Sequence, residues 1–357
     1  MADPISQRKA DHLDLCSQAD VGFRHKATLL EQVELLHNAL PELAVEQVDL
    51  STMLLGKTLR APIVIAAMTG GIERAARINH ELASVAEQRG YGFGLGSQRP
   101  MLERGPHESY LVRDTAPSCL LLGNLSGVQA SKLPTQTVAE LGSVVGADAM
   151  CIHLNPAMEL VQASGDRDFQ GVLGTLVRLH AELPMAVVAK ETGCGLGWPT
   201  AIRLAQAGIR HVDVSGAGGT SWVAVEGARA EPAKQRLAAL LRDWGIPTAA
   251  SVAYAARTEP RFATVIATGG IRSGLDIARA LALGAHAVGI ARPMLQALFS
   301  GGRKALLQLC AELEAELRAV MVLVGARTIG ELARAPRVLG AELDGWLRAQ
   351  PSAAGAR

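Results

Sequence analysis

The chain has 357 residues, of which 49% are hydrophobic and 19% are charged, and this composition excludes an intrinsically disordered protein. Its 35 Lys and Arg residues balance 34 Asp and Glu residues to a formal net charge of +1, so we expect no bulk electrostatic binding to nucleic acid or to an anionic membrane. Aromatic residues make up only 3% of the chain, which also argues against stacking platforms for single-stranded nucleic acid.

The cysteines and the N-terminus indicate the compartment. The chain has five cysteines, an odd number, at scattered positions without a CxxC motif, which predicts neither a disulfide framework nor a zinc site. Residues 1–9 are polar and lack the apolar core of a signal peptide. No run approaches the roughly 18 apolar residues that cross a bilayer. We therefore expect a reduced, cytoplasmic protein that makes no membrane contact.

Short apolar runs recur along the chain, and they are continuous rather than alternating, which is typical of parallel strands covered on both faces. They lie at residues 62–68, 91–97, 118–124, 149–155, 184–190, 211–216, 264–269 and 285–291. Helical spacing between them, with glycine at several ends, predicts helices at residues 78–90, 137–147, 200–209 and 274–285. This α/β pattern favours a closed (β/α)8 TIM barrel over the alternative, an open doubly wound sheet.

Three segments depart from this rhythm. Residues 220–245 predict a long loop with one amphipathic helix, either over the C-terminal barrel face where ligands bind or as a plain surface insertion. Residues 305–325 predict one long amphipathic helix, and residues 351–357 a frayed end. We expect a single domain over residues 1–357. It comprises an N-terminal extension with a binding arm (1–61), a barrel (62–300) and C-terminal helices (301–350).

The most specific local pattern runs from Ala267 to Met294, where GGIRSG follows the seventh strand and GIAR ends the eighth. Glycines at a strand end let backbone N–H groups approach an anion, and a helix N-terminus adds a favourable dipole. Barrels often bind phosphate in these two loops, although ordinary strand–turn–helix glycines are the alternative. Ser215 and Thr220, after the sixth strand, offer further hydrogen-bond donors. The predicted phosphate ligands are therefore Ser215, Thr220, Gly269, Gly270, Arg272, Ala291 and Arg292.

This pattern resembles the phosphate-binding region of FMN-dependent barrel enzymes, so other strand ends are predicted to meet a flavin ring. These residues are Ala67, Met68, Thr69, Ser97, Asn124 and Lys190. Lys190 ends an apolar strand, where a cation needs a partner. That partner is either an anionic reduced flavin or a neighbouring carboxylate, Glu191 or Asp213.

A set of motifs in this order resembles the type 2 isopentenyl-diphosphate isomerases from Arg8 to about Trp346. The motifs are RKxxH (8–12), AMTGG (67–71), GSQR (96–99), HLN (153–155) with a following Glu, ATGGIR (267–272) and GART (325–328). The resemblance implies an FMN-dependent barrel that interconverts isopentenyl and dimethylallyl diphosphate with no net redox change. It also implies flavin reduction by NAD(P)H, taken here as NADPH, a need for Mg²⁺, a small isoprenoid diphosphate as substrate, and a homo-oligomer, a tetramer or larger.

The resemblance also assigns roles to residues. A diphosphate needs several donors in one cleft, and the matching side chains are Arg8, Lys9, Ser97, Gln98 and Arg99. Glu159 is the implied Mg²⁺ ligand, since Mg²⁺ often binds one or two carboxylates plus substrate phosphates. The local alternative for Glu159 is a first-turn helix carboxylate stabilised by the helix dipole. His153, Asn155 and position 158 complete the implied catalytic set.

Position 158 departs from the family, which has a Gln before the metal-binding Glu to assist proton transfer. Here Met158 offers only a weakly accepting thioether. Gln162 lies near the same helical face and substitutes only if the turn is distorted. Three outcomes stay open: a working isomerase, which we favour, an enzyme of reduced activity, and a paralogue with altered flavin chemistry on a phosphorylated isoprenoid.

Two other classes compete. An FMN-dependent oxidoreductase acting on hydroxy acids uses a His after the sixth strand, and SGAGGTSW at residues 215–222 contains none. A non-catalytic flavin or phosphate binder has no need of Lys9, His153, Asn155 and Glu159 together. The oxidoreductase is therefore the nearest alternative to the isomerase.

Overall fold

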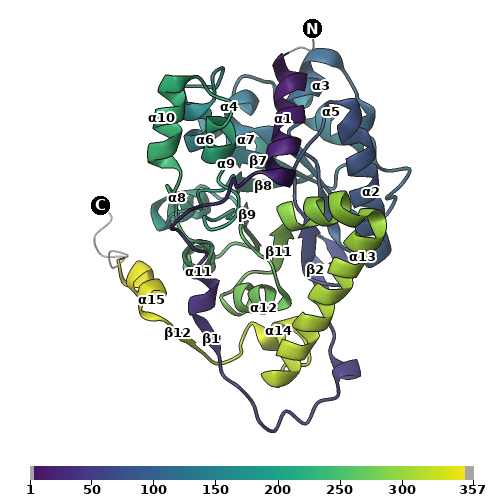
Figure 1. The fold of residues 1–357 in the computed structure, drawn as a ribbon, viewed down its shortest axis with the longest axis vertical. Helices are drawn as coiled ribbons and strands as arrows, with labels where there is room; N and C mark the ends of the chain where they lie inside the picture. Colours follow the sequence, from purple (N-terminus) through teal and green to yellow (C-terminus); the bar gives the residue numbers. More distant parts are fainter. Residues whose placement is uncertain (1–3, 350–357) are drawn as a thin grey trace.

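The computed structural model describes residues 4–349, and a closed barrel of parallel strands forms its centre (Figure 1). The strands are β4 (Ile63–Ile65), β5 (Gly92–Gly94), β6 (Leu120–Ser126), β7 (Ala149–Leu154), β8 (Ala186–Glu191), β9 (His211–Asp213), β10 (Thr264–Thr268) and β11 (Ala287–Ile290). They pair in chain order, and β11 pairs with β4 to close the ring. The predicted (β/α)8 barrel is confirmed, and every predicted apolar run overlaps one of these strands.

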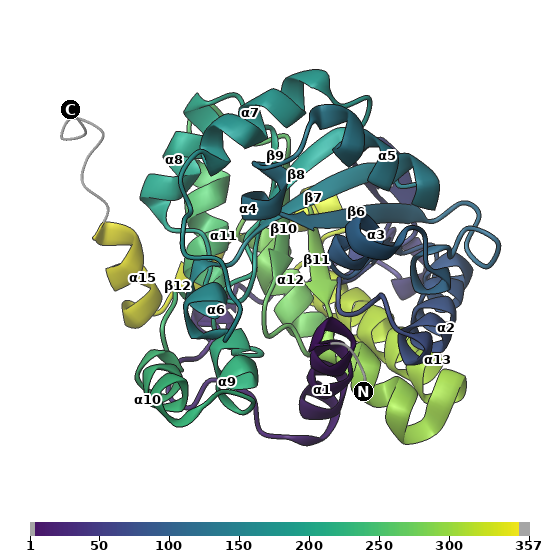
Figure 2. The same ribbon diagram turned by 90° about the horizontal axis from the view of Figure 1, so that it is seen from above.

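Helices surround the barrel, as the view from above shows (Figure 2). They are α2 (Glu73–Arg89), α3 (Arg99–Arg104), α4 (Gly127–Ala130), α5 (Thr135–Val145), α6 (Pro156–Val161), α7 (Val172–Glu182), α8 (Trp198–Gln206), α11 (Thr248–Arg257) and α12 (Gly274–Ala282). The helices predicted from spacing correspond to α2, α5, α8 and α12. Helices α2 and α5 end at Gly90 and Gly146, whose φ angles of 67° and 66° lie in the left-handed region that glycine adopts without strain.

The core has two layers. Apolar side chains between the strands and the outer helices form the larger one. A smaller cluster fills the barrel interior and includes Val64, Leu122 and Val188. Leu54 and Leu59 join this inner cluster from the β2 (Thr52–Leu54) and β3 (Lys57–Leu59) hairpin. The hairpin therefore closes the interior from one end, which the sequence analysis did not predict.

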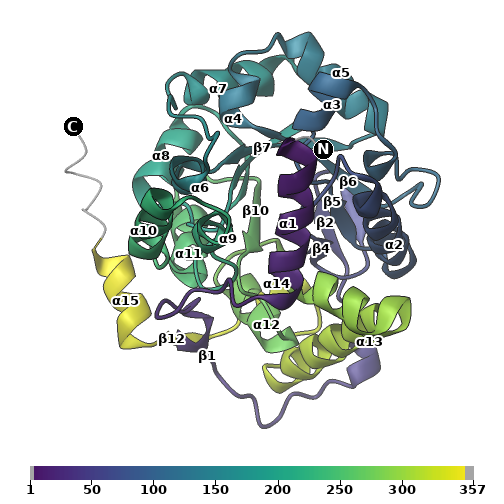
Figure 3. The ribbon, with the colours of Figure 1, turned by 45° about the horizontal axis from the view of Figure 1, so that its top comes forward.

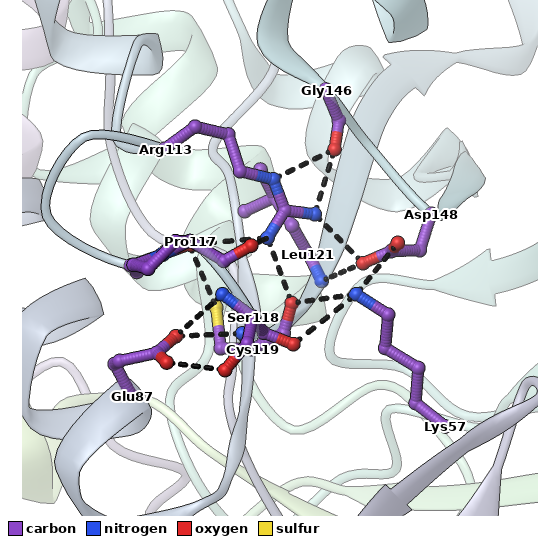
Figure 4. Close-up of polar contacts among 10 residues, drawn as sticks. Lys57, Glu87, Arg113, Pro117, Ser118, Cys119, Leu121, Gly146 and Asp148 are labelled. Carbon is purple, nitrogen blue, oxygen red and sulfur yellow. Dashed lines mark hydrogen bonds and ion pairs between the residues drawn. The ribbon is translucent and has the colours of Figure 1, made fainter.

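A polar network lies at the end of the barrel where strands β6 and β7 begin (Figure 4). The Arg113 guanidinium donates hydrogen bonds to the carbonyl oxygens of Gly146 and Cys119, and it pairs with Asp148 at 2.8 Å. Lys57 of the hairpin reaches the other Asp148 oxygen at 2.8 Å. These contacts hold the N-terminal end of the barrel together, whereas ligands bind at the opposite end of such barrels.

The connection over residues 220–245 contains two helices, α9 (Trp222–Gly227) and α10 (Pro232–Leu241), rather than the single predicted helix. The predicted helix at 305–325 is part of a longer one, α13 (Arg292–Leu323), which is broken by non-helical backbone at Gly301 and Gly302. The prediction for residues 351–357 lies outside the described residues. No helix in residues 4–349 is both long and apolar enough to cross a membrane.

Two segments that lie far apart in the sequence pair in a small separate sheet. Strand β1 (Val33–Leu35) pairs antiparallel with β12 (Arg337–Leu339), and the two lie side by side in Figure 1. The remaining elements are the 3-10 turns η1 (Leu30–Gln32), η2 (Val45–Gln47) and η3 (Glu108–Tyr110), and the helices α14 (Ile329–Leu332) and α15 (Ala341–Arg348).

The predicted N-terminal arm is a helix, α1 (Pro4–Gln18), which crosses the mouth of the barrel (Figure 3). Arg292 holds its C-terminal end by donating hydrogen bonds to the carbonyl oxygens of Cys16 at 3.0 Å and Ala19 at 2.7 Å. Arg229, just after α9, pairs with Asp11 at 2.7 Å. These contacts seat α1 above the ends of the strands.

Candidate active site

A cavity of about 450 Å³ lies at the C-terminal ends of the strands, with α1 forming part of its wall. All but one of the residues predicted for the site line it. They are Arg8, Lys9, Ala67, Met68, Thr69, Ser97, Arg99, Asn124, His153, Asn155, Met158, Glu159, Lys190, Ser215, Thr220, Gly269, Gly270, Arg272, Ala291 and Arg292. Residues from nine separate segments thus meet where parallel strands end, because all eight strands point the same way.

Gln98 is the exception, and its predicted substrate contact needs correction. Its side chain is fully buried and turned into the barrel wall. The amide nitrogen donates to the carbonyl oxygen of Leu141 at 2.8 Å, and the amide oxygen accepts from the backbone N–H of Asn124 at 2.9 Å. Gln98 therefore fastens β6 beside the cavity, while its neighbours Ser97 and Arg99 face the cavity itself.

His153 presents a neutral imidazole to the cavity. The Asn124 amide nitrogen donates to the carbonyl oxygen of Leu95 at 3.0 Å, which leaves the Asn124 amide oxygen 2.9 Å from His153 Nδ1. This network assigns the proton to Nδ1 and leaves Nε2 as an acceptor. Burial, and after it the nearby cations Lys190, Lys9 and Arg8, lower the pKa of His153 to about 3.

Lys190 lies low in the cavity between neighbouring strands. The barrel register aligns it with His153 on β7 and with Asp213 on β9. Its ammonium forms a buried ion pair with the Asp213 carboxylate at 2.8 Å. Of the two predicted partners of Lys190, the carboxylate is therefore present. Lys190 also lines the cavity, so its ammonium is available both to Asp213 and to a ligand in the cavity.

Two cations enter the cavity from α1. The Lys9 side chain is buried, and burial together with the adjacent Arg8 lowers the pKa of its ammonium to about 7. Burial likewise lowers the pKa of Arg8. Arg99 faces the same space. Buried cations in one cleft repel each other, so an anionic ligand between them is strongly favoured.

Glu159 lies in the first turn of α6, where the helix dipole can stabilise a carboxylate. It also lines the cavity, as the predicted metal ligand must. Its side chain is buried. One oxygen accepts from the Asn155 amide at 2.8 Å, and the other accepts from the backbone N–H of Asp166 at 2.8 Å. Residues 4–349 contain no cluster of three or more His, Cys, Asp or Glu side chains that could hold a metal ion. A metal here would need oxygen ligands from a substrate, and this is the way Mg²⁺ commonly binds.

The chain leaves the α6 helix at Gln162, whose ψ of 136° is extended rather than helical. Gln162 was predicted to take the place of the family's Gln only if this turn is distorted, and the extended backbone is such a distortion. It leaves Gln162 buried at 3% exposure and lining the same cavity as Met158 and Glu159. The Met158 sulfur lies 3.8 Å from the Asn155 amide nitrogen and offers that donor only a weak acceptor.

The predicted phosphate loops form a tightly packed cradle. Gly269 and Gly270 have φ angles of 117° and 71°, which favour glycine. A Cβ atom on Gly269 would lie 2.2 Å from the Gly216 carbonyl oxygen, and one on Gly219 would lie 2.5 Å from the Gly270 nitrogen. Arg272 donates to the carbonyl oxygen of Gly218 at 3.4 Å. These loops can therefore pack this closely only with glycine at positions 219 and 269.

Unpartnered polar atoms gather at this cavity. Within the part of the chain that the structure describes, eight buried side-chain atoms lack a hydrogen-bond partner, and all but the Ser251 hydroxyl belong to cavity-lining residues. These residues are Arg8, Thr69, Ser126, Gln129, Gln162, Thr192 and Thr268. Each such group costs about 1–3 kcal/mol when left unsatisfied. The concentration of these groups in one place fits a site built for polar ligands, including a flavin phosphate and a diphosphate.

Some lining residues were not predicted. His12 Nε2 lies 2.8 Å from a Glu226 oxygen, and its ring packs edge-on against Trp222 at 5.4 Å between centroids. His12 and Trp222 both line the cavity. Two features of the sequence could have indicated these residues: His12 ends the RKxxH motif, and Trp222 lies in the connection over the C-terminal face. The pairing of His12 with Glu226 had no sequence signal, since the two are 214 residues apart.

The barrel and its cavity define the class of this protein. Residues 2–101 and 157–338 match the FMN-dependent dehydrogenase family. A mandelate oxidase with (S)-mandelic acid has a TM-score of 0.61 at 19% identity, with 94% of this chain and 97% of that chain covered. A lactate oxidase of Pediococcus acidilactici has a TM-score of 0.64 at 17% identity, with 89% and 88% covered. At these identities the likeness shows a shared fold.

Closer relatives specify the family. The isopentenyl-diphosphate delta-isomerase of Synechococcus sp. is 48% identical over 320 residues, covering 88% of this chain and 91% of that protein. Those of Methanothermobacter thermautotrophicus and Pyrococcus horikoshii are each 41% identical, covering 96% and 95% of this chain and 96% and 94% of theirs. The chain belongs to the isopentenyl-diphosphate delta-isomerase family, which confirms the predicted resemblance.

Proposed function

We propose that this protein interconverts isopentenyl and dimethylallyl diphosphate, using reduced FMN and Mg²⁺ without net redox change. The observation that supports the proposal is the set of residues that line one cavity. A glycine cradle for a phosphate, three cations for a second anion, and a buried carboxylate beside a neutral imidazole all line it. An oxidase of hydroxy acids would need one carboxylate-binding group, whereas this cavity carries cations suited to a diphosphate.

Arg8, Lys9 and Arg99 are the proposed diphosphate ligands. Their positive charges converge from α1 and from the end of β5, so they would neutralise several phosphate oxygens. Burial lowers the pKa of Lys9. An anion bound next to Lys9 would raise this pKa again and keep the ammonium charged. Glu159 is the proposed Mg²⁺ ligand, since its carboxylate is held in place by Asn155 and by the Asp166 backbone.

The proposed FMN site combines the phosphate cradle at β10 and β11 with the strand ends Ala67, Met68, Thr69, Ser97, Asn124 and Lys190. The unpartnered hydroxyls of Thr69 and Thr268 support this site, because a ring or ribityl chain with polar edges would satisfy them. When bound there and reduced by NADPH, FMN would supply an electron-rich ring suited to stabilising positive charge and to acid–base chemistry. Lys190, neutralised in part by Asp213, would hold the negative edge of that ring.

The protein residues must also protect a cationic transition state from water. Helix α1 covers the mouth and contributes Leu13 and Cys16 to the lining, so it would limit water access beside the alkene. His153 stays neutral and adds no positive charge there. Asn155 lines the same cavity and donates a hydrogen bond to Glu159 through its amide, which would hold that carboxylate in place.

A second candidate is an altered-activity relative acting on a phosphorylated isoprenoid, and Met158 is the observation that favours it. The side chain lines the cavity beside Glu159 but carries no exchangeable proton. The proposal also includes a cytoplasmic location, expected from the cysteines and the polar N-terminus, and a homo-oligomer, a tetramer or larger, which the family resemblance implies.

The deciding experiment uses the purified full-length protein. We expect a yellow protein with bound FMN that bleaches with NADPH and then converts isopentenyl diphosphate to dimethylallyl diphosphate only with Mg²⁺. Colourless protein without affinity for FMN would refute the whole proposal. A yellow protein that binds the diphosphate but gives no dimethylallyl product would favour the second candidate.

A further inference from the structure

Three polar side chains that line the same cavity as Glu159 have no role in the function proposed above. They are Ser126 at the end of β6, Gln129 in α4, and Gln162 where the chain leaves α6. All three line the cavity, and each has a buried atom without a hydrogen bond: the Ser126 hydroxyl, the Gln129 amide oxygen and the Gln162 amide nitrogen. Ser126 and Gln162 are 2% and 3% exposed, so bulk water does not satisfy them.

Several contacts connect the segments that carry these side chains to the segments around the Glu159 carboxylate. Ser126 is the register partner of His153, at the point where β6 and β7 end. Lys132, just after α4, pairs at 3.0 Å with Asp166, whose backbone N–H donates to Glu159. Arg167 donates to the backbone carbonyls of both Glu159 and Gln162. The end of α4 and the turn after α6 are therefore tied together around one carboxylate.

The chemistry of the Glu159 site explains why such groups are needed. Mg²⁺ demands six oxygen ligands and keeps several waters when the protein supplies one or two carboxylates. Metal-bound waters are strong hydrogen-bond donors and require acceptors around them. Hydroxyl and amide oxygens are good acceptors, and the end torsion of a glutamine side chain lets either end of its amide face a ligand.

We propose that Ser126, Gln129 and Gln162 hold the water ligands of the diphosphate-bound metal at Glu159. This inference rests on the proposed function, because it assumes that a metal diphosphate binds there. The three residues position the hydrated metal and make no contact with the reacting carbons. Their proposed role also accounts for the buried, unpartnered amide atoms of Gln129 and Gln162, because burying a polar atom without a hydrogen bond is costly.

The test measures binding of Mn²⁺, as a spectroscopic substitute for Mg²⁺, to FMN-loaded full-length protein with isopentenyl diphosphate or inorganic pyrophosphate. The variants are Ser126→Ala, Gln129→Met and Gln162→Met. We expect each to lower Mn²⁺ affinity by about 10–100-fold, the usual loss for residues that support metal ligands. Diphosphate affinity measured without metal, and FMN affinity measured by flavin fluorescence, stay at the wild-type values.

Two further variants sharpen this test. Gln136→Met alters an exposed glutamine of α5, whose amide bonds only to Glu140 on the same helix, and is expected to leave Mn²⁺ affinity unchanged. Gln129→Glu keeps an acceptor and adds negative charge, so it is expected to retain or raise Mn²⁺ affinity while weakening diphosphate binding without metal.

Unchanged Mn²⁺ affinity in both Gln129→Met and Gln162→Met would overturn the inference. So would an equal loss of diphosphate affinity with and without metal, because the side chains would then contact the diphosphate itself. None of these measurements needs turnover. Binding of the metal diphosphate without isomerisation would reject the proposed function and leave this inference standing.

Discussion

His153 makes the stability of the flavin-free protein depend on pH, and the size of the effect follows from its surroundings. Its pKa falls from about 6.5 to about 3 in the folded protein, first through burial and then through Lys190, Lys9 and Arg8. Below pH 6.5 the unfolded chain therefore binds a proton at this residue that the folded chain does not. Stability is lost as pH falls through this window, between about 6.5 and 3.

The expected loss between pH 7 and pH 5 is about 2 kcal/mol, since pH 5 lies about 1.5 units below the unfolded pKa and each unit is worth about 1.36 kcal/mol. The ring is partly exposed to the hydrated cavity, which reduces the shift, so we expect about 1–2 kcal/mol. Glu191 acts in the opposite direction, because burial raises its pKa to about 8 and its folded form binds the extra proton between about pH 4.5 and 8.

A paired variant isolates the His153 contribution. His153→Gln keeps an amide donor for Asn124 but cannot titrate, and Glu191 is unchanged in it. Urea unfolding of both proteins at pH 7, 6 and 5 gives the difference in the free energy of unfolding. That difference should move by about 1–2 kcal/mol in favour of the variant as the pH falls. Parallel pH profiles, or an imidazole that titrates near pH 6.5 by NMR in the folded protein, would refute the reasoning.

Three other changes are directly testable. Arg113→Met removes several hydrogen bonds at the closed end of the barrel (Figure 4), so urea unfolding should show a loss of about 3 kcal/mol while FMN affinity, by fluorescence titration, stays constant; weaker FMN binding would contradict the separation of the two ends. Met158→Gln should raise isomerase turnover if the thioether is a handicap, and unchanged or lower turnover would show that it is not. Gly269→Ala forces a Cβ atom onto the Gly216 carbonyl at an unfavourable φ, so FMN affinity should fall at least tenfold, a loss of about 1.4 kcal/mol; wild-type affinity would mean that the cradle does not hold the phosphate.

The barrel, and the gathering of the strand-end residues at one cavity, were predictable from the sequence because both depend on local patterns. Continuous apolar runs separated by helices specify parallel strands, and parallel strands in a barrel bring their ends together. Residues that close those runs, such as Asn124, His153 and Lys190, therefore had to meet at one face. The register then placed His153 and Lys190 side by side without any further information.

Contacts between distant segments had no such pattern and were decided by the tertiary structure. Ser97, Gln98 and Arg99 stand together in one motif, yet the buried amide of Gln98 turns into the wall because β6 and α5 offer it partners there. The N-terminal arm becomes helix α1 because Arg292 and Arg229, from far along the chain, supply partners for its carbonyl and carboxylate oxygens. A sequence determines which side chains end each strand, but only packing determines which of them find partners in the protein and which are left facing the cavity.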